Sequence, residues 1–185
     1  MKSGLPQSPA SQRGVVLIIA LVMLVVISLL TTLSIRSATS TEKVSGNVRT
    51  TELASQAAEV ALRYCEDAVV QLYMGTVTLP ATPSVLDFQI PLRWKDTANW
   101  DVTGSEAFVV PAGFVNQGSG PPTFKRPPEC MVERMEVVSS TGALSTTSTY
   151  VITARGFGPE VAEADAARVR PQGSEVWMQS TIELQ

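Results

Sequence analysis

The sequence predicts an α+β protein, in which one long N-terminal helix packs on a C-terminal antiparallel sheet of three or more strands. Val15–Ile35 is an apolar run that contains no charge, no Pro and no Gly. No proline occurs between Pro9 and Pro80, so a helix that starts in this run can continue well beyond it. Residues 129–185 contain segments with the two-residue alternation of strands.

The chain divides by composition into a short polar start, an apolar segment, a helical continuation and a head. A helix over Val15–Ile35 covers roughly 30 Å, which is the thickness of one bilayer hydrocarbon core. Residues 1–14 are free of acids and end in Arg13-Gly14. The predicted boundaries are 1–14 for a leader, 15–35 for the transmembrane part of the helix, 36–74 for its amphipathic continuation, and 75–185 for the head.

Beyond the apolar run, small and apolar residues recur at steps of three and four. This spacing gives one narrow stripe that can pack closely on a sheet. Gly75 is a suitable residue to follow a helix that ends at Met74. The stripe consists of Ala54, Ala57, Ala58, Ala61, Cys65, Ala68, Val69 and Leu72.

Residues 75–128 are rich in Pro and Gly, so regular structure there must be short. Eight of the twelve prolines lie in this region. The candidate strand pieces are Leu86–Ile90 and Ala107–Val110. Trp94 and Trp100 have two interpretations, an exposed interface or the plug of a small core under a long loop, and we favour the core.

Residues 129–185 are predicted to form the sheet. The three candidate strands are Cys130–Val138, Thr147–Ala154 and Glu175–Leu184, and the last alternates most regularly. Ser139–Leu144 is the expected hairpin turn, and the link over residues 156–174 is long. A sheet with one apolar face needs a cover, and the helix stripe supplies it.

The two cysteines, Cys65 and Cys130, are expected to form a disulfide, because the head is predicted outside the cytoplasm. Two free buried thiols are the alternative. Two sulfurs in a chain without histidine make a poor zinc site.

The composition argues against several classes of function. The chain has no histidine, and therefore lacks the usual general base, and no catalytic residues are assigned. The net charge is −3 with no basic patch, so no nucleic-acid partner is predicted. We expect a protein that is not an enzyme, with no cofactor and no metal.

Two groups of carboxylates are not expected to form sites. Glu160, Glu163 and Asp165 lack the spacing of an EF-hand calcium loop, and a solvated acidic loop is expected. Glu129, Glu133 and Glu136 lie on a predicted strand and are expected to be charges on its exposed face.

The N-terminal arrangement resembles that of a type IV prepilin: a short basic leader ending in glycine, an apolar helix and an amphipathic continuation. This resemblance implies cleavage by a prepilin peptidase between Gly14 and Val15, followed by methylation of the Val15 amino group. The anchor then survives processing, whereas a secretory signal is cut after its apolar region. It also implies an inner-membrane protein with a single span and a periplasmic head, which later joins a pilus at the cell surface.

The chain departs from most pilins at Ile19, the fifth residue after the cut, where the family usually carries a glutamate. The minor pilin PilX and the secretion pseudopilin GspK share this departure, and both are placed at filament tips. The segments YVITARGFG and EVWMQSTIEL also look like the end of PilX-type sequences. The resemblance implies a PilX-like minor pilin of a priming and tip complex, which initiates pilus assembly and supports adhesion and twitching motility. The implied partners are other minor pilins, the major pilin, the prepilin peptidase, the inner membrane and a tip adhesin.

Two other functions remain open. A GspK-like tip pseudopilin of type II secretion typically carries a large helical insertion, and the proline-rich middle of this chain shows no helical periodicity. A periplasmic binding or sensor domain held by a signal anchor is the third candidate, and such a protein would keep its leader.

Overall fold

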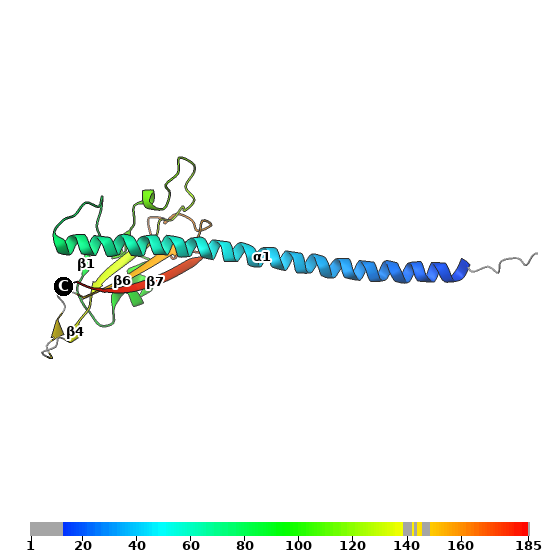
Figure 1. Cartoon of the computed structure of the whole chain (residues 1–185), viewed down its shortest axis with the longest axis horizontal. Coiled ribbons are helices and arrows are strands. Elements are labelled where there is room, and N and C mark those ends of the chain that lie inside the picture. Colours follow the sequence, from blue (N-terminus) through cyan, green and yellow to red (C-terminus); the bar gives the residue numbers. More distant parts are fainter. Residues whose placement is uncertain (1–12, 139–141, 143, 146–148, 185) are drawn as a thin grey trace, which may run out of the picture. The chain divides into compact units, whose positions relative to one another are not determined.

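The computed structural model describes residues 13–138, 142, 144–145 and 149–184. It divides into two compact units, residues 1–46 and residues 47–185. Helix α1, Arg13–Met74, supplies the described part of the first unit and continues into the second (Figure 1). Gly75 follows it with φ +69°, a conformation that ends helices and that glycine adopts without strain. The long helix was therefore predicted correctly.

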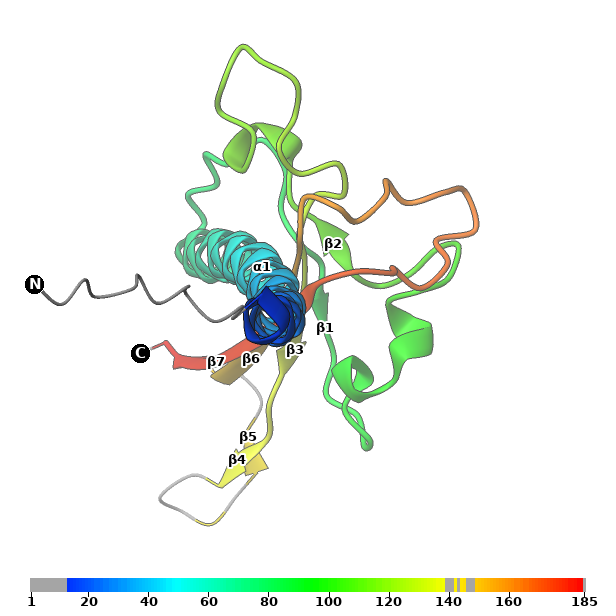
Figure 2. The same cartoon turned by 90° about the vertical axis from the view of Figure 1, so that its right-hand side faces the viewer.

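The second unit contains a five-stranded sheet and a two-stranded hairpin. The sheet has the order β1-β3-β6-β7, and β2 also pairs with β3. Figure 2 shows α1 on one face of this sheet, with the hairpin β4–β5 to one side. The strands are β1 Val85–Leu86, β2 Phe108–Val109, β3 Glu129–Arg134, β4 Val137–Val138, β5 Leu144–Ser145, β6 Thr149–Phe157 and β7 Glu175–Glu183.

The sheet is mixed, whereas the sequence predicted an antiparallel one. The pairs β2–β3, β3–β6 and β6–β7 are antiparallel, but β1 runs parallel to β3. β1 contains only two residues, which is too short for the alternation of a sequence to reveal its direction. The α+β class and the long strands are nevertheless as predicted.

Several strand boundaries differ from the prediction, and of the candidate piece Leu86–Ile90 only Leu86 lies in a strand, β1. The predicted strand Cys130–Val138 is divided into β3 and β4, and the backbone N–H of Met135 donates to Thr149 O at 2.9 Å at the break. β6 continues to Phe157, three residues beyond its predicted end at Ala154. Most of the predicted turn Ser139–Leu144 lies outside the described residues, although Gly142 has φ +79° and β4 pairs antiparallel with β5.

The core lies between the C-terminal half of α1 and the sheet. Except for Leu72, which is 38% exposed, every residue of the predicted helix stripe is at most 2% exposed. The stripe is therefore confirmed, but its buried part ends at Val69, one helical turn before the predicted last residue. Its partners include Val110, Val132, Tyr150, Ile152 and Ala154.

Gly156 lets the helix backbone approach β6 closely. A Cβ added to Gly156 would lie 2.8 Å from Ala58 Cα and closer still to Ala54 O and Ala58 N. Backbone atoms cannot move aside as a flexible side chain can. The contact therefore explains why the facing stripe is alanine: small residues on the helix and glycine on the strand bring the two backbones together.

We expect Gly156→Ala to lower the free energy of unfolding of the head by about 1–3 kcal/mol or more, as overpacking does in tight cores. Urea unfolding of the full chain in detergent, followed by tryptophan fluorescence, measures this change. Gly113→Ala is the matched control, because a Cβ there meets no atom within 4 Å and φ is not positive. Equal stability of the two variants would contradict the close approach.

Trp100 fills a small second core beside the sheet. It is fully buried with Ala107 and Met131, and Trp94 packs half-buried against them. Its indole Nε1 donates to the carbonyl oxygen of Trp94 at 3.1 Å. The core interpretation of both tryptophans is therefore confirmed. Residues 75–128 contain three short 3-10 helices, Arg93–Lys95, Thr97–Asn99 and Ala112–Phe114.

Candidate functional site

The first unit presents an apolar helix surface. Val15–Thr32 has a mean hydropathy of 3.1 and is long and apolar enough to cross a membrane. All side chains described in this segment are exposed. Because apolar surface is costly to leave in water, this segment is suited to lipid.

The hydroxyl groups within this apolar segment are satisfied by the helix itself. Ser28 Oγ donates to Leu24 O at 2.7 Å, and Thr31 Oγ1 donates to Ile27 O at 2.8 Å. Thr32 donates in the same way to Ser28 O. Hydrogen bonds to the carbonyl four residues earlier leave no free hydroxyl donor on these residues, which lowers the cost of placing them in hydrocarbon.

The predicted processing residues and the position of the missing glutamate all belong to α1. Gly14 and Val15 follow directly on the first residue of the helix, Arg13. Ile19 is 53% exposed on the apolar surface. The first acidic residue of the chain is Glu42, so no carboxylate lies in the membrane-sized segment. Cleavage, methylation and the role of Ile19 remain predictions.

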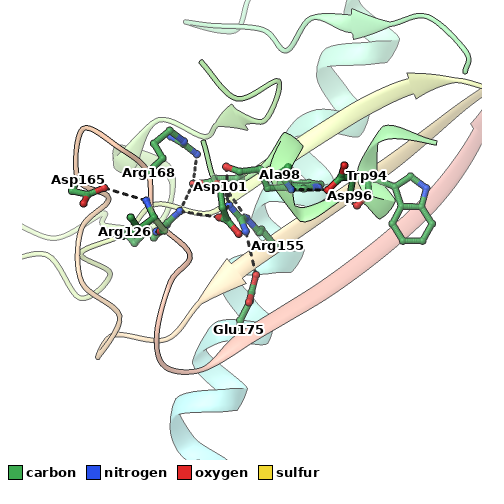
Figure 3. A network of polar contacts seen from close by, with 12 residues as sticks. Trp94, Asp96, Ala98, Asp101, Arg126, Arg155, Asp165, Arg168 and Glu175 are labelled. Atoms are coloured by element: carbon green, nitrogen blue, oxygen red, sulfur yellow. Dashed lines mark hydrogen bonds and ion pairs between the residues drawn. The ribbon is translucent and has the colours of Figure 1, made fainter. Parts of the chain in front are cut away.

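The second unit holds a buried ionic cluster centred on Arg155 of β6 (Figure 3). The Arg155 side chain is fully buried and donates to Glu129 Oε2 from Nε at 3.0 Å and from Nη2 at 2.7 Å. Nη2 also lies 2.7 Å from Asp101 Oδ1, and Nη1 lies 3.4 Å from Glu175 Oε1. One guanidinium thus joins three carboxylates from separate parts of the chain.

Two further arginines complete the cluster around Glu129. Arg168 Nη2 donates to Glu129 Oε1 at 2.7 Å, and Arg126 Nη2 lies 3.5 Å from the same oxygen. The three arginines and three carboxylates balance in charge, as buried ion pairs must. The expectation that Glu129 lies on an exposed strand face is wrong, because this residue is 1% exposed.

Aromatic rings surround these guanidinium groups. The Arg155 guanidinium carbon lies 5.0 Å from the centre of the Trp100 ring, 5.2 Å from Phe157 and 5.4 Å from Trp177. The corresponding carbon of Arg126 lies 4.7 Å from the Phe157 ring. Cation–π contacts of this kind stabilise a charge where water is excluded.

The electrostatics of Arg155 and Arg126 differ. Burial, the largest single influence on each, lowers the pKa. At Arg155 the hydrogen bonds and charges of Asp101 and Glu129 outweigh burial, so its pKa is raised above its usual value. At Arg126 the attraction of Glu129 is weaker than burial and the repulsion of the other two arginines, so its pKa is lowered. Arg155 is therefore the electrostatic centre of the cluster.

Glu133 is a second carboxylate that the sequence misplaced. It is 1% exposed and accepts the backbone N–H of Arg93 at 2.7 Å and that of Trp94 at 3.1 Å. It thereby fixes the first 3-10 turn of residues 75–128 to β3. Glu136 is exposed, as predicted.

The acidic loop uses two of its three carboxylates to shape itself. Glu160 Oε1 accepts the backbone N–H of Ser174 at 2.6 Å, and Asp165 Oδ1 accepts that of Val169 at 3.1 Å. Burial raises the pKa of Glu160, but its hydrogen bonds to Ser174 outweigh this and lower it below 4.5. In the described part of the chain, no group of three or more His, Cys, Asp or Glu is placed to hold a metal ion.

Cys65 of α1 and Cys130 of β3 form a disulfide, as predicted, with their Cα atoms 6.7 Å apart. Both residues are fully buried in the core between helix and sheet. The bond closes a loop that contains all of residues 75–128, and it ties this irregular region to the rest of the head.

The charged groups of the ionic cluster are paired with one another across separate segments of the chain, and this arrangement supports a structural role. It clamps the segment around Asp101, strands β3 and β6, the loop around Arg168 and the start of β7. One signal could have found it: Glu129 and Arg155 are directly opposed in the β3–β6 register. The sequence prediction ended the strand before Arg155 and so missed the pair.

Residues 13–63 match the family described as PilX N-terminal, which covers α1 up to Arg63 and none of the sheet. No curated protein matches the chain. No solved structure matches it.

Proposed function

We propose that this chain, a PilX-like type IV pilin anchored in the membrane by its N-terminal helix, joins other minor pilins in a priming complex that initiates pilus assembly and then stays at the pilus tip. Its head would face the periplasm before assembly and the cell surface afterwards. There it would support adhesion and twitching motility through contacts with the major pilin and a tip adhesin. The role is structural rather than catalytic.

The observation that carries this proposal is the PilX N-terminal match over a helix with Ile19 at the fifth position after the predicted cut. A carboxylate in lipid is costly unless it is paired. In most pilins the partner of that carboxylate is thought to be the amino terminus of a neighbouring subunit. A chain with isoleucine there has no such charge to satisfy, and it can therefore occupy the last position of a filament.

The described part of the head favours a pilus over a secretion filament. Within residues 75–138 and 149–184, the helical elements are three 3-10 helices of three residues each. A GspK-like protein typically has a large helical insertion, and these described ranges contain none. This observation ranks the type II secretion role below the pilus role.

The proposed processing can be tested by mass spectrometry of the chain extracted from membranes that contain a prepilin peptidase. We expect an N-terminus at Val15 that carries a methyl group. Gly14→Leu should leave the leader attached, whereas Gly4→Leu, a matched change inside the leader, should still be cut. An intact Met1 in the wild-type chain, or normal processing of Gly14→Leu, would favour a signal-anchored sensor domain instead.

We expect Ile19→Glu to leave the head folded but to reduce the number of pili that are started. A carboxylate costs about 2.5–3.5 kcal/mol at the centre of a membrane helix and less at position 19, which is nearer the helix end, but it is unfavourable unless a partner is supplied, and a terminal subunit has none. Pili per cell, counted by electron microscopy at matched protein levels, measure the effect.

Ile19→Gln is the control for this change, because it adds a polar group of similar size without a charge. It should reduce initiation less than Ile19→Glu. Normal pilus numbers with Ile19→Glu would contradict the electrostatic argument and leave the assignment to a tip without its main support.

A further inference from the structure

We propose that the outer edge of β7 is a docking site for an extended segment of a partner protein, which adds to the sheet as a further strand. The partner segment has apolar residues at alternate positions and a basic residue opposite Glu183. The proposal concerns the head alone and does not depend on which filament the chain joins.

The position of β7 in the sheet leaves one of its edges open. β7 is the last strand in the order β1-β3-β6-β7, and its nine residues pair with all nine residues of β6 (Figure 2). Among the described residues, no other strand pairs with it. All nine residues of β6 are buried, whereas none of β7 is.

The opposite edge of the sheet, that of β3, is covered by other strands. β2 pairs with Cys130 and Glu129, and β1 pairs with Val132 and Glu133, so two short strands cover successive parts of the outer edge of β3. A sheet edge offers unpaired N–H and C=O groups to other chains, and proteins usually protect it with Lys, Pro, bulges or short strands. β7 is nine residues long and contains neither Lys nor Pro.

The side chains of β7 offer two distinct faces to a new strand. Val176, Met178 and Ile182 alternate on one face of the strand and are only half-buried, and Ile182 packs against the core between helix and sheet. Trp177 is 38% exposed on the other face and packs edge-on against Trp100, with 4.8 Å between the ring centres. An added strand would cover apolar area on both faces, and aromatic cross-strand pairs are among the more favourable ones.

The charges of β7 argue against a second copy of this chain as the occupant. An antiparallel pair of β7 strands centred on Gln179 would place Glu175 of one copy opposite Glu183 of the other, at both ends of the pair. Directly opposed like charges destabilise a sheet. Glu175 is already paired with Arg155, but Glu183 is exposed and has no ion pair within the described residues. A partner with a basic residue at that position is therefore favoured.

The test uses the full-length chain in detergent and a capped nine-residue probe, Lys-Val-Thr-Val-Thr-Val-Thr-Val-Lys. Its lysines lie opposite the two glutamates, and its valines face the helix side. We expect binding, measured by fluorescence anisotropy, and slower hydrogen exchange of the amides of Glu175–Glu183. The same peptide with glutamates at both ends should bind roughly fivefold more weakly, since both opposed pairs change from unlike to like charge and the one at Glu183, which Arg155 does not neutralise, contributes most.

Two controls separate strand addition from other binding. Glu183→Lys, a change at an exposed residue, should reverse the preference between the two peptides. A probe that is N-methylated at alternate residues keeps its side chains but cannot complete the ladder, and it should lose binding. Equal binding of the N-methylated probe, unchanged exchange in β7, or a concentration-dependent dimer that protects β7 would each overturn the proposal.

Discussion

Arg155→Met is expected to lower the free energy of unfolding of the head by about 3–5 kcal/mol, the cost of removing one partner of a buried ion pair. Methionine fills a similar volume and can pack against Trp100 and Phe157, so the loss is electrostatic rather than a cavity. Glu129 and Asp101, whose side chains are 1% and 8% exposed, would lose their main counter-ion.

Urea unfolding of the full chain in detergent measures this loss. All three tryptophans lie in the head, so their fluorescence reports on the head without a contribution from the membrane segment. Arg134→Met is the matched control on the neighbouring strand β3. Arg134 pairs at 3.2 Å with Asp87, which is 84% exposed, and such pairs contribute about 0–1 kcal/mol.

A double variant tests whether charge imbalance causes the effect. Arg155→Met combined with Glu129→Gln removes one charge of each sign and leaves the cluster neutral. We expect it to lose less stability than the sum of the two single changes, because neighbours in one network are coupled. The proposed role would be wrong if the stability losses of the two single changes were strictly additive, or if Arg155→Met were as stable as Arg134→Met. Either result would mean that the ionic cluster does not hold these segments together.

The parts of the fold that the sequence predicted well are those that local periodicity determines. The helix stripe from Ala54 to Val69 follows directly from steps of three and four. β7 was found because its side chains alternate over nine residues, one face packing toward the helix and the other exposed. Such patterns need no knowledge of what lies elsewhere in the chain.

The ionic cluster could not be predicted in this way, because its burial depends on distant loops. In the alternating pattern of β3, Glu129 lies on the face away from the helix. It would be exposed if that face of β3 were in contact with water. The segment around Asp101 and the loop around Arg168 cover that face instead. Both are irregular, so no local pattern indicates where they fold.

The predicted processing residues were found neither from local periodicity nor from the fold. Gly14, Val15 and Ile19 were identified through resemblance, and the PilX N-terminal match supports the family of the helix in which they lie. Cleavage by a peptidase depends on the local sequence around the cut, and insertion into the membrane depends on hydropathy. The relevant measurements are therefore chemical and cellular.

Loss of the Cys65–Cys130 disulfide is expected to lower the free energy of unfolding by about 4 kcal/mol on the chain-entropy model, because the bond closes a loop of 65 residues. That loop includes the irregular residues 75–128, whose many unfolded conformations the cross-link restricts. Cys65→Ala combined with Cys130→Ala, unfolded in urea, measures the loss. Both cysteines are fully buried, so alanine also removes packing.

Reduction separates these two contributions. Wild-type chain unfolded in the presence of a thiol reductant loses only the cross-link, whereas the double-alanine variant loses the cross-link and the sulfur atoms. We expect reduction to lower the free energy of unfolding of the wild type by most of the amount that the double-alanine variant loses. The stability of the variant should not change with reductant. If reduction changes the stability of the wild-type head little while the variant is still strongly destabilised, packing rather than loop closure is the contribution of these cysteines. Residues 75–128 would then be held mainly by the buried carboxylates Glu129 and Glu133.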